Sequence, residues 1–175
     1  MKKKSEKTGV IYIFTNPSFP EYVKIGYADD AKERLKTLNS SSAVPFAFRA
    51  YATYEVDHKL EDNKIHKIID TINPELRSID DVNGKKRKRE FFQMSKEQAY
   101  TLFECIAEIS GTKDRLHLVK ATENDIKAEV EASEIREMSV NRHHFKNIEF
   151  YSSLTNKYYY TRTSKQGTLS VFEKD

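Results

Sequence analysis

The sequence has 175 residues, of which 33% are charged and 38% hydrophobic, enough for one good core and a smaller appendage but not for two large domains. No apolar run approaches the about 20 residues that a membrane-spanning helix needs, and the basic residues 1–5 lead into no apolar segment typical of a signal peptide. Cys105 is the single cysteine, which excludes an intrachain disulfide and a four-cysteine zinc site. We expect a cytoplasmic protein without membrane contacts, in which residues 1–8 form a basic tail.

The first third of the chain predicts a β-hairpin, a helix and a third strand. β-branched and aromatic residues indicate strands over 9–14, 22–26 and 46–56. Asn16 and Pro17 signal the hairpin turn, which Asn16 is expected to cap. Asp30 and Glu33 have the spacing of a capping box, so we expect a helix from about residue 30 to residue 38.

Two further helices are predicted from apolar periodicity. The first follows Asp57, ends before Pro74 and has a buried stripe of Leu60, Ile65, Ile68, Ile69 and Ile72. The second opens with the capping-box pair Ser95 and Gln98 and buries Leu102, Phe103, Ile106 and Ile109. Cys105 is expected to pack beside that second stripe.

Beyond residue 111 the composition of the sequence changes. Residues 112–140 are charged and sparsely apolar, which suits a helical connector, and 141–175 suggest a small β-rich appendage with strands near 148–151, 157–162 and 168–172. The chain stops directly after a strand-like run, so one interpretation is that this appendage is truncated. Its rings and cations, Tyr158, Tyr159, Tyr160 and Arg162, favour equally a contact with nucleic acid and an edge hairpin that packs on the core.

The positive charge is concentrated in one run. The formal net charge is +3, and without the five consecutive cations it would fall to −2; these are Lys85, Lys86, Arg87, Lys88 and Arg89. Such a run is most often a solvated loop. The alternative is a strip that binds the phosphates of nucleic acid.

Two helices carry a charge where their periodicity asks for an apolar side chain. Arg34 lies within the stripe of the first helix, and Glu61 falls near the middle of the apolar arc of the second. A buried unpaired charge costs several kcal/mol. The two residues are therefore either a structural ion pair or parts of a polar cleft, with the arginine binding phosphate and the carboxylate binding a metal.

These residues belong to a longer pattern. Ile11-Tyr12, Lys24-Ile25-Gly26, Arg34 eight residues after that glycine, and Leu60-Glu61 opening a helix follow each other in order. Over residues 9–110 the pattern resembles the GIY-YIG nuclease superfamily, in a phage and bacterial branch that has Lys24 in place of the second tyrosine. The resemblance implies an α+β fold for 9–111, a small three-stranded antiparallel sheet flanked by helices, with a single-metal phosphodiesterase site.

The resemblance also implies roles for individual residues. Tyr12 would act on the attacking water as a general base or beside one, Arg34 would hold the scissile phosphate, and Glu61 would be the protein ligand of Mg²⁺ or Mn²⁺. Lys24 leaves the identity of the base open, because a lysine can hold phosphate or deprotonate water. Tyr27 can supply a second phenol.

Two more residues are candidates by the same resemblance. His66 can orient the water or contact a phosphate, and Glu90 can support the residues in direct contact with substrate. We expect a divalent-metal-dependent endonuclease whose partner is DNA. The alternative is a catalytically inactive GIY-YIG-like module that binds nucleic acid. No pattern in the sequence bears on the oligomeric state.

Overall fold

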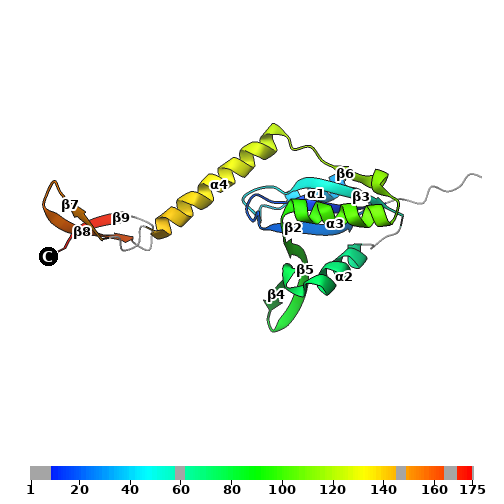
Figure 1. Cartoon of the computed structure of the whole chain (residues 1–175), viewed down its shortest axis with the longest axis horizontal. Helices are drawn as coiled ribbons and strands as arrows, with labels where there is room; N and C mark the ends of the chain where they lie inside the picture. The colour runs from blue at the N-terminus through cyan, green and yellow to red at the C-terminus, as the bar shows by residue number, and fades with distance from the viewer. Residues whose placement is uncertain (1–8, 58–61, 145–148, 164–168, 175) are drawn as a thin grey trace, which may run out of the picture. The chain divides into compact units, whose positions relative to one another are not determined.

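The computed structural model describes residues 9–57, 62–144, 149–163 and 169–174 (Figure 1). The chain divides into two compact units, Met1–Ala128 and Glu129–Asp175. None of the described helices is long and apolar enough to span a membrane. Helices and antiparallel strands are both present, so the expected α+β class is confirmed.

The first unit is built on a sheet that has six strands among the described residues. The strands are β1 (Gly9–Thr15), β2 (Tyr22–Ala28), β3 (Arg49–Val56), β4 (Arg77–Val82), β5 (Lys85–Gln93) and β6 (Leu116–Leu118). Their order is β4-β5-β2-β1-β3-β6, and every neighbouring pair is antiparallel. The three predicted strands are the central ones. The expected sheet of three strands is therefore wrong in extent, because β4 and β5 extend it on one side and β6 on the other.

The basic run forms a strand, so the prediction of a loop is wrong. β5 contains all five cations and pairs with β4 in a hairpin whose turn is Asn83-Gly84. Both turn residues have positive φ, 56° and 74°, as the tight turns of two-residue hairpins require. Cross-strand pairing with β4 therefore orders a segment whose charge run alone suggested solvated coil.

Three helices pack on this sheet: α1 (Ala31–Asn39), α2 (Asp62–Ile72) and α3 (Lys96–Ile109). The two predicted N-caps are confirmed. The Asp30 side chain accepts from the backbone N–H groups of Lys32 and Glu33, and Ser95 forms a reciprocal capping box with Gln98. Short 3₁₀ turns, η1 (Pro74–Leu76) and η2 (Lys113–Arg115), precede β4 and β6.

The alternation of side chains along β1 divides the core into two layers. Ile11 and Ile13 point into the larger cluster, which the inner sides of α2 and α3 complete. Tyr12 and Phe14 point to the other face, where they pack with Phe48 and with apolar side chains of α1. Tyr12 is thereby placed on the same face as α1.

The predicted buried stripes of α2 and α3 are partly wrong. On α2, Ile65 and Ile69 are buried, but Ile68 and Ile72 are 38% and 73% exposed, and Leu60 lies outside the described residues. On α3, Phe103 is buried while Ile109 and Cys105 are exposed. The buried line of α2 also contains two polar residues, which periodicity of apolar residues alone does not reveal.

The second unit contains most of α4 (Glu123–His144) and a separate antiparallel sheet. Its strands are β7 (Glu149–Ser152), β8 (Lys157–Thr163) and β9 (Leu169–Glu173), in the order β7-β8-β9. The three short strands predicted for this region are confirmed.

Asn16 holds the loop between β1 and β2, and its expected role at this turn is confirmed. Asn16 is 1% exposed, and its side chain donates to the Phe46 carbonyl at 2.7 Å and accepts from the Ser18 N–H at 2.8 Å.

We predict that Asn16→Ala lowers the free energy of unfolding by about 1–3 kcal/mol, because it leaves partly buried backbone groups unpaired. Urea unfolding measures this, with exposed Asn124→Ala as the matched control, expected to change stability by less than about 0.5 kcal/mol. Equal effects of the two substitutions would contradict the assignment.

Candidate functional site

Five of the predicted site residues lie close together where β5 separates from β2: Tyr12, Lys24, Arg34, His66 and Glu90. The ladder between these strands pairs only Tyr22, Val23 and Lys24 of β2. One residue further, the carbonyl of Ile25 bonds instead to His66 Nε2 of α2, at 2.9 Å. This opening lets side chains from the two faces of the sheet approach one another.

Tyr12 lies at the centre of the cluster. Its ring is fully buried and stacks on Phe14 with 3.9 Å between the ring centroids. Gly26 is its cross-strand partner, and a Cβ there would lie 2.5 Å from the Tyr12 hydroxyl, so a side chain at 26 would displace the phenol. Arg34 reaches over from α1, and its Nε donates to the same hydroxyl at 3.4 Å.

Lys24 and Glu90 form an ion pair beside the tyrosine. Their charged atoms are 2.5 Å apart, the lysine side chain is 8% exposed, and that of the glutamate is 42% exposed. The ammonium also lies 5.2 Å from the centre of the Phe91 ring. The position of a Cβ at Gly26 would be 3.3 Å from Glu90 Oε2, which puts this pair next to the Tyr12 hydroxyl. Solvent reaches the cluster through Glu90 and the half-buried Arg34.

The environment raises the pKa of Tyr12 and lowers that of Glu90. Burial raises the pKa of Tyr12; the hydrogen bond from Arg34 lowers it, and the charges of Glu90 and Asp62 raise it again, with a net rise. Burial raises the pKa of Glu90. The hydrogen bond and the charge of Lys24 lower this pKa by more than burial raises it, so the pKa falls overall. At neutral pH the phenol is therefore protonated and Glu90 is a carboxylate.

His66 is buried with both ring nitrogens occupied. Its Nε2–H donates to the Ile25 carbonyl, so Nδ1 is the acceptor, and Arg77 Nη2 lies 3.4 Å from it. Burial lowers the pKa of His66, and the nearby Arg77 charge lowers it further. The ring is therefore neutral at pH 7, and in this arrangement neither nitrogen is free to take a proton from water.

Asp62 is a site residue that the sequence analysis missed. It is 5% exposed, and its Oδ1 is buried without a hydrogen-bond partner among the described residues. Its charge acts on Tyr12 and His66. The signal was present in the sequence: Asp62 precedes Ile65 by three, His66 by four and Ile69 by seven residues, which is one face of a helix. The predicted carboxylate, Glu61, lies outside the described residues.

Tyr27 lies on the opposite face of β2 from Lys24 and Gly26. Its hydroxyl donates to Asp29 at 2.8 Å, and its ring occupies the space above Gly9, where a Cβ would meet the hydroxyl at 2.0 Å. It therefore does not join the Tyr12 cluster.

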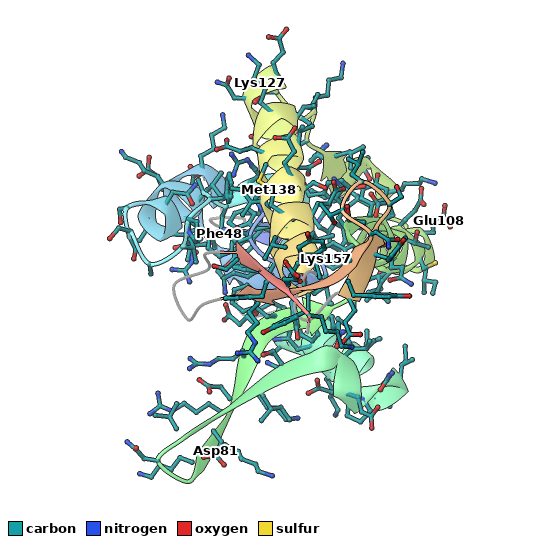
Figure 2. The ribbon with its side chains drawn as sticks, turned by 90° about the vertical axis from the view of Figure 1, so that its left-hand side faces the viewer. Phe48, Asp81, Glu108, Lys127, Met138 and Lys157 are labelled. Carbon is teal, nitrogen blue, oxygen red and sulfur yellow. The ribbon has the colours of Figure 1, made fainter. Side chains whose placement is uncertain are left out.

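The hairpin of β4 and β5 extends beyond the rest of its unit, with Asp81 near its free end (Figure 2). Asp70 of α2 holds the base of the hairpin, because its Oδ2 accepts from Arg77 at 3.0 Å and from Lys88 at 2.9 Å. Arg89 pairs with Asp80 of β4. The other three predicted cations, Lys85, Lys86 and Arg87, are exposed and have no ion pair among the described residues.

A family model for the T5orf172 domain matches residues 9–107. The chain belongs to this family. The resemblance to the GIY-YIG superfamily is therefore corrected, because the family that matches is a different one. No curated protein and no solved structure matches the chain. The matched residues of the T5orf172 domain contain Tyr12, Lys24, Arg34, Asp62 and Glu90.

The lowered pKa of His66 predicts a pH dependence of stability in the T5orf172 domain. As the pH falls below the ordinary histidine value of 6.5, the unfolded chain takes up a proton that the folded chain resists. Stability is thus fully retained above about pH 6.5 and falls below it, by at most about 1.4 kcal/mol per pH unit from this group. We expect His66→Gln to flatten the slope of unfolding free energy between about pH 5 and 6.5, in metal-free buffer.

The control is Asn63→Gln, which changes an exposed residue of the same helix that carries no titratable group and should leave the slope as it is. An unchanged slope in the His66 variant would show that the ring is not held neutral by its surroundings.

Proposed function

We propose that the T5orf172 unit is a divalent-metal-dependent endonuclease that hydrolyses phosphodiester bonds in DNA. The observation that carries the proposal is the buried Asp62 carboxylate, which has an oxygen without a partner within electrostatic reach of the Tyr12 hydroxyl. A buried anionic oxygen without a partner is costly unless something binds it. The Tyr12 hydroxyl that this charge acts on is bonded to Arg34 and lies near the Lys24–Glu90 pair, and a phenol with two cations suits a phosphate group.

The residues present fit a hard divalent cation. Mg²⁺ prefers oxygen ligands and keeps most of its waters, so one or two carboxylates suffice. No group of three or more His, Cys, Asp or Glu residues able to hold a metal occurs in the part of the chain that the structure describes. Asp62 would hold Mg²⁺ or Mn²⁺. Bound there, the ion would supply Lewis-acid stabilisation of charge on the phosphoryl oxygens.

Arg34, Lys24 and Tyr12 would hold and orient the phosphate. Arg34 donates a hydrogen bond from Nε to the Tyr12 hydroxyl. Its two terminal NH₂ groups have no acceptor among the described residues. A guanidinium in this state can bind phosphate oxygens through both groups. Because the Tyr12 oxygen accepts from Arg34, its own proton is directed elsewhere and can donate to the substrate. Lys24 adds a second cation close to the same hydroxyl.

Glu90 is the group best suited to take the proton of the attacking water. Its pKa is lowered, so it is ionised at neutral pH, and it is the more exposed member of its ion pair. Tyr12 is a poor base because its pKa is raised. In this proposal His66 is a positioning residue, which fixes α2, and with it Asp62, against the Ile25 carbonyl.

The basic hairpin would bind the flanking DNA. Lys85, Lys86 and Arg87 lie near its turn, exposed and free of ion pairs in the described structure. Exposed cations supply the sequence-independent part of DNA affinity through phosphate contacts.

The decisive test is cleavage of supercoiled plasmid with Mg²⁺. We expect Asp62→Asn to abolish cleavage and Arg34→Ala to slow it by about 10²–10³-fold, the usual effect of removing one stabilising donor. Both variants should still bind DNA, because the hairpin is unchanged. Glu61→Gln, one residue before Asp62, is the matched control and should keep activity.

Activity lost in Glu61→Gln but kept in Asp62→Asn would contradict the choice of carboxylate. A wild-type chain that binds DNA without cleaving it under Mg²⁺ or Mn²⁺ would favour a binding module without catalysis.

The hairpin proposal predicts a change in salt dependence. Lys85→Gln with Lys86→Gln should weaken duplex binding and reduce the slope of log K against log salt by about 2, near 0.9 for each lost phosphate contact. Fluorescence anisotropy with a labelled duplex in EDTA, over a series of salt concentrations, measures this. The double variant Lys120→Gln with Lys127→Gln removes two exposed cations elsewhere and should leave the slope unchanged. Equal slopes for both double variants would place the DNA contact outside the hairpin.

A further inference from the structure

The second unit presents an aromatic face that the proposed cleavage site does not use. Side chains alternate along a strand, and directly paired residues share a face of the sheet. On β8, Tyr158, Tyr160 and Arg162 point to one side. Tyr151 of β7 pairs with Tyr158, and Phe172 of β9 pairs with Tyr160. Four rings and a guanidinium therefore lie together on this face, which we call the aromatic face.

The rings of the aromatic face form two adjacent pairs. The centroids of Tyr151 and Tyr158 are 5.1 Å apart, and those of Tyr160 and Phe172 are 5.4 Å apart with nearly parallel planes. Arg162 lies over the second pair, 5.2 Å from the Tyr160 centroid and 6.0 Å from that of Phe172. The cation–π contacts hold the guanidinium flat on the sheet.

The aromatic face is open to solvent. Tyr158, Tyr151 and Phe172 are 58%, 49% and 42% exposed, whereas Thr161, on the opposite face of β8, is 5% exposed. Contiguous exposed apolar patches mark interaction sites, whereas single exposed side chains do not, and the four rings of this face are contiguous.

The composition of the aromatic face identifies the kind of partner. Its described side chains are aromatic, cationic or polar, and none is aliphatic: Tyr151, Tyr158, Tyr160, Phe172, Arg162, Ser170, Glu149 and Lys174. Tyr and Arg also serve as anchors at protein–protein interfaces, so a second copy of the chain is the competing occupant that the experiment below addresses. Rings beside a cation match the two parts of an unpaired nucleotide, a flat base that stacks on aromatic rings and a phosphate that binds positive charge.

A groove beside the aromatic face supports this assignment. It has a volume of about 420 Å³ and is lined by Tyr158, Asn156, Lys157, Lys174 and Glu149. Its size lies in the range of small-ligand sites. A base stacked on Tyr158 would thus have polar groups and Lys174 close to its sugar and phosphate, with Lys174 paired to Glu149 and Lys157 paired to Glu173 in the absence of a ligand.

We propose that the aromatic face binds unpaired bases of single-stranded nucleic acid by stacking. This site is separate from the cluster around Tyr12 and does not depend on cleavage. Duplex DNA buries its bases in the helical stack, so it presents no base faces to these rings.

The test is binding of a labelled 20-nucleotide oligo(dT) to the full chain in EDTA, where no metal-dependent reaction interferes. Tyr158→Leu keeps apolar area but loses the ring, and we expect about 5- to 150-fold weaker binding, the range for one lost base stack. Tyr158→Phe keeps the ring and should bind nearly as the wild type. Tyr159→Leu, on the opposite face of β8, is the matched control and should have little effect. Equal affinity of the Tyr158→Leu and Tyr159→Leu variants would overturn the proposal.

A second measurement needs no variant. A strand of 20 abasic nucleotides keeps the phosphates and lacks the bases, so the wild-type chain should bind it at least about tenfold more weakly than oligo(dT). Equal affinity for the two strands would overturn the proposal even if Tyr158→Leu fails to fold. Oligo(rU) in place of oligo(dT) should bind through the same rings and reports whether the sugar is read. A Tyr158-dependent change in molecular mass by light scattering, without base-dependent binding, would instead make this face a contact between two copies of the chain.

Discussion

The separation of β5 from β2 after Lys24 is the constraint on which the first unit depends. Where the ladder stops, the carbonyl of Ile25 loses its strand partner, and an unpaired buried carbonyl costs about 1–3 kcal/mol. His66 supplies the missing donor from α2. This bond requires a proton on Nε2, and it raises the pKa of His66, whereas burial and the charge of Arg77 lower that pKa and keep the ring neutral overall. The position of α2 against the sheet is thus fixed by a polar bond as well as by Ile65 and Ile69.

The same separation organises the polar side of α2. Asp62, His66 and Asp70 follow each other at intervals of four residues, so they lie on one line along the helix. The first brings a carboxylate to the Tyr12 cluster, the second bonds to β2, and the third binds Arg77 and Lys88 at the base of the hairpin. A single helix therefore links the candidate site to the basic hairpin. A shift of the hairpin base would change the surroundings of His66 through Arg77.

The sequence alone predicted the elements whose signals are local. It failed where contacts with residues distant in the chain determine the structure. β-branched and aromatic residues located the three central strands, and the caps at Asp30 and Ser95 followed from spacing alone. The stripe of α2 was misjudged because only apolar residues were counted, while the buried line of that helix includes the polar residues Asp62 and His66. Asp62 was not considered, although it is one step of about 100° along the helix from Glu61; Glu61 lies outside the described residues, and its role as metal ligand stays a prediction. The basic run became a strand only through pairing with β4.

The cations of the first unit fall into two classes that differ in how they can act. Under the proposed function, a phosphate would replace Glu90 as the partner of Lys24 and would bind the terminal groups of Arg34, which its bond to Tyr12 holds in place, so it would gain orientation more than net attraction. The cations near the hairpin turn have no ion pair among the described residues, so binding displaces only their water. Their attraction extends over roughly a Debye length of 8–10 Å before salt screens it. Under the proposed function, affinity and salt dependence would therefore reside in the hairpin and geometric selectivity in the buried cluster. This division explains why the charge run stands out in the sequence while the residues that would act on phosphate are dispersed along it.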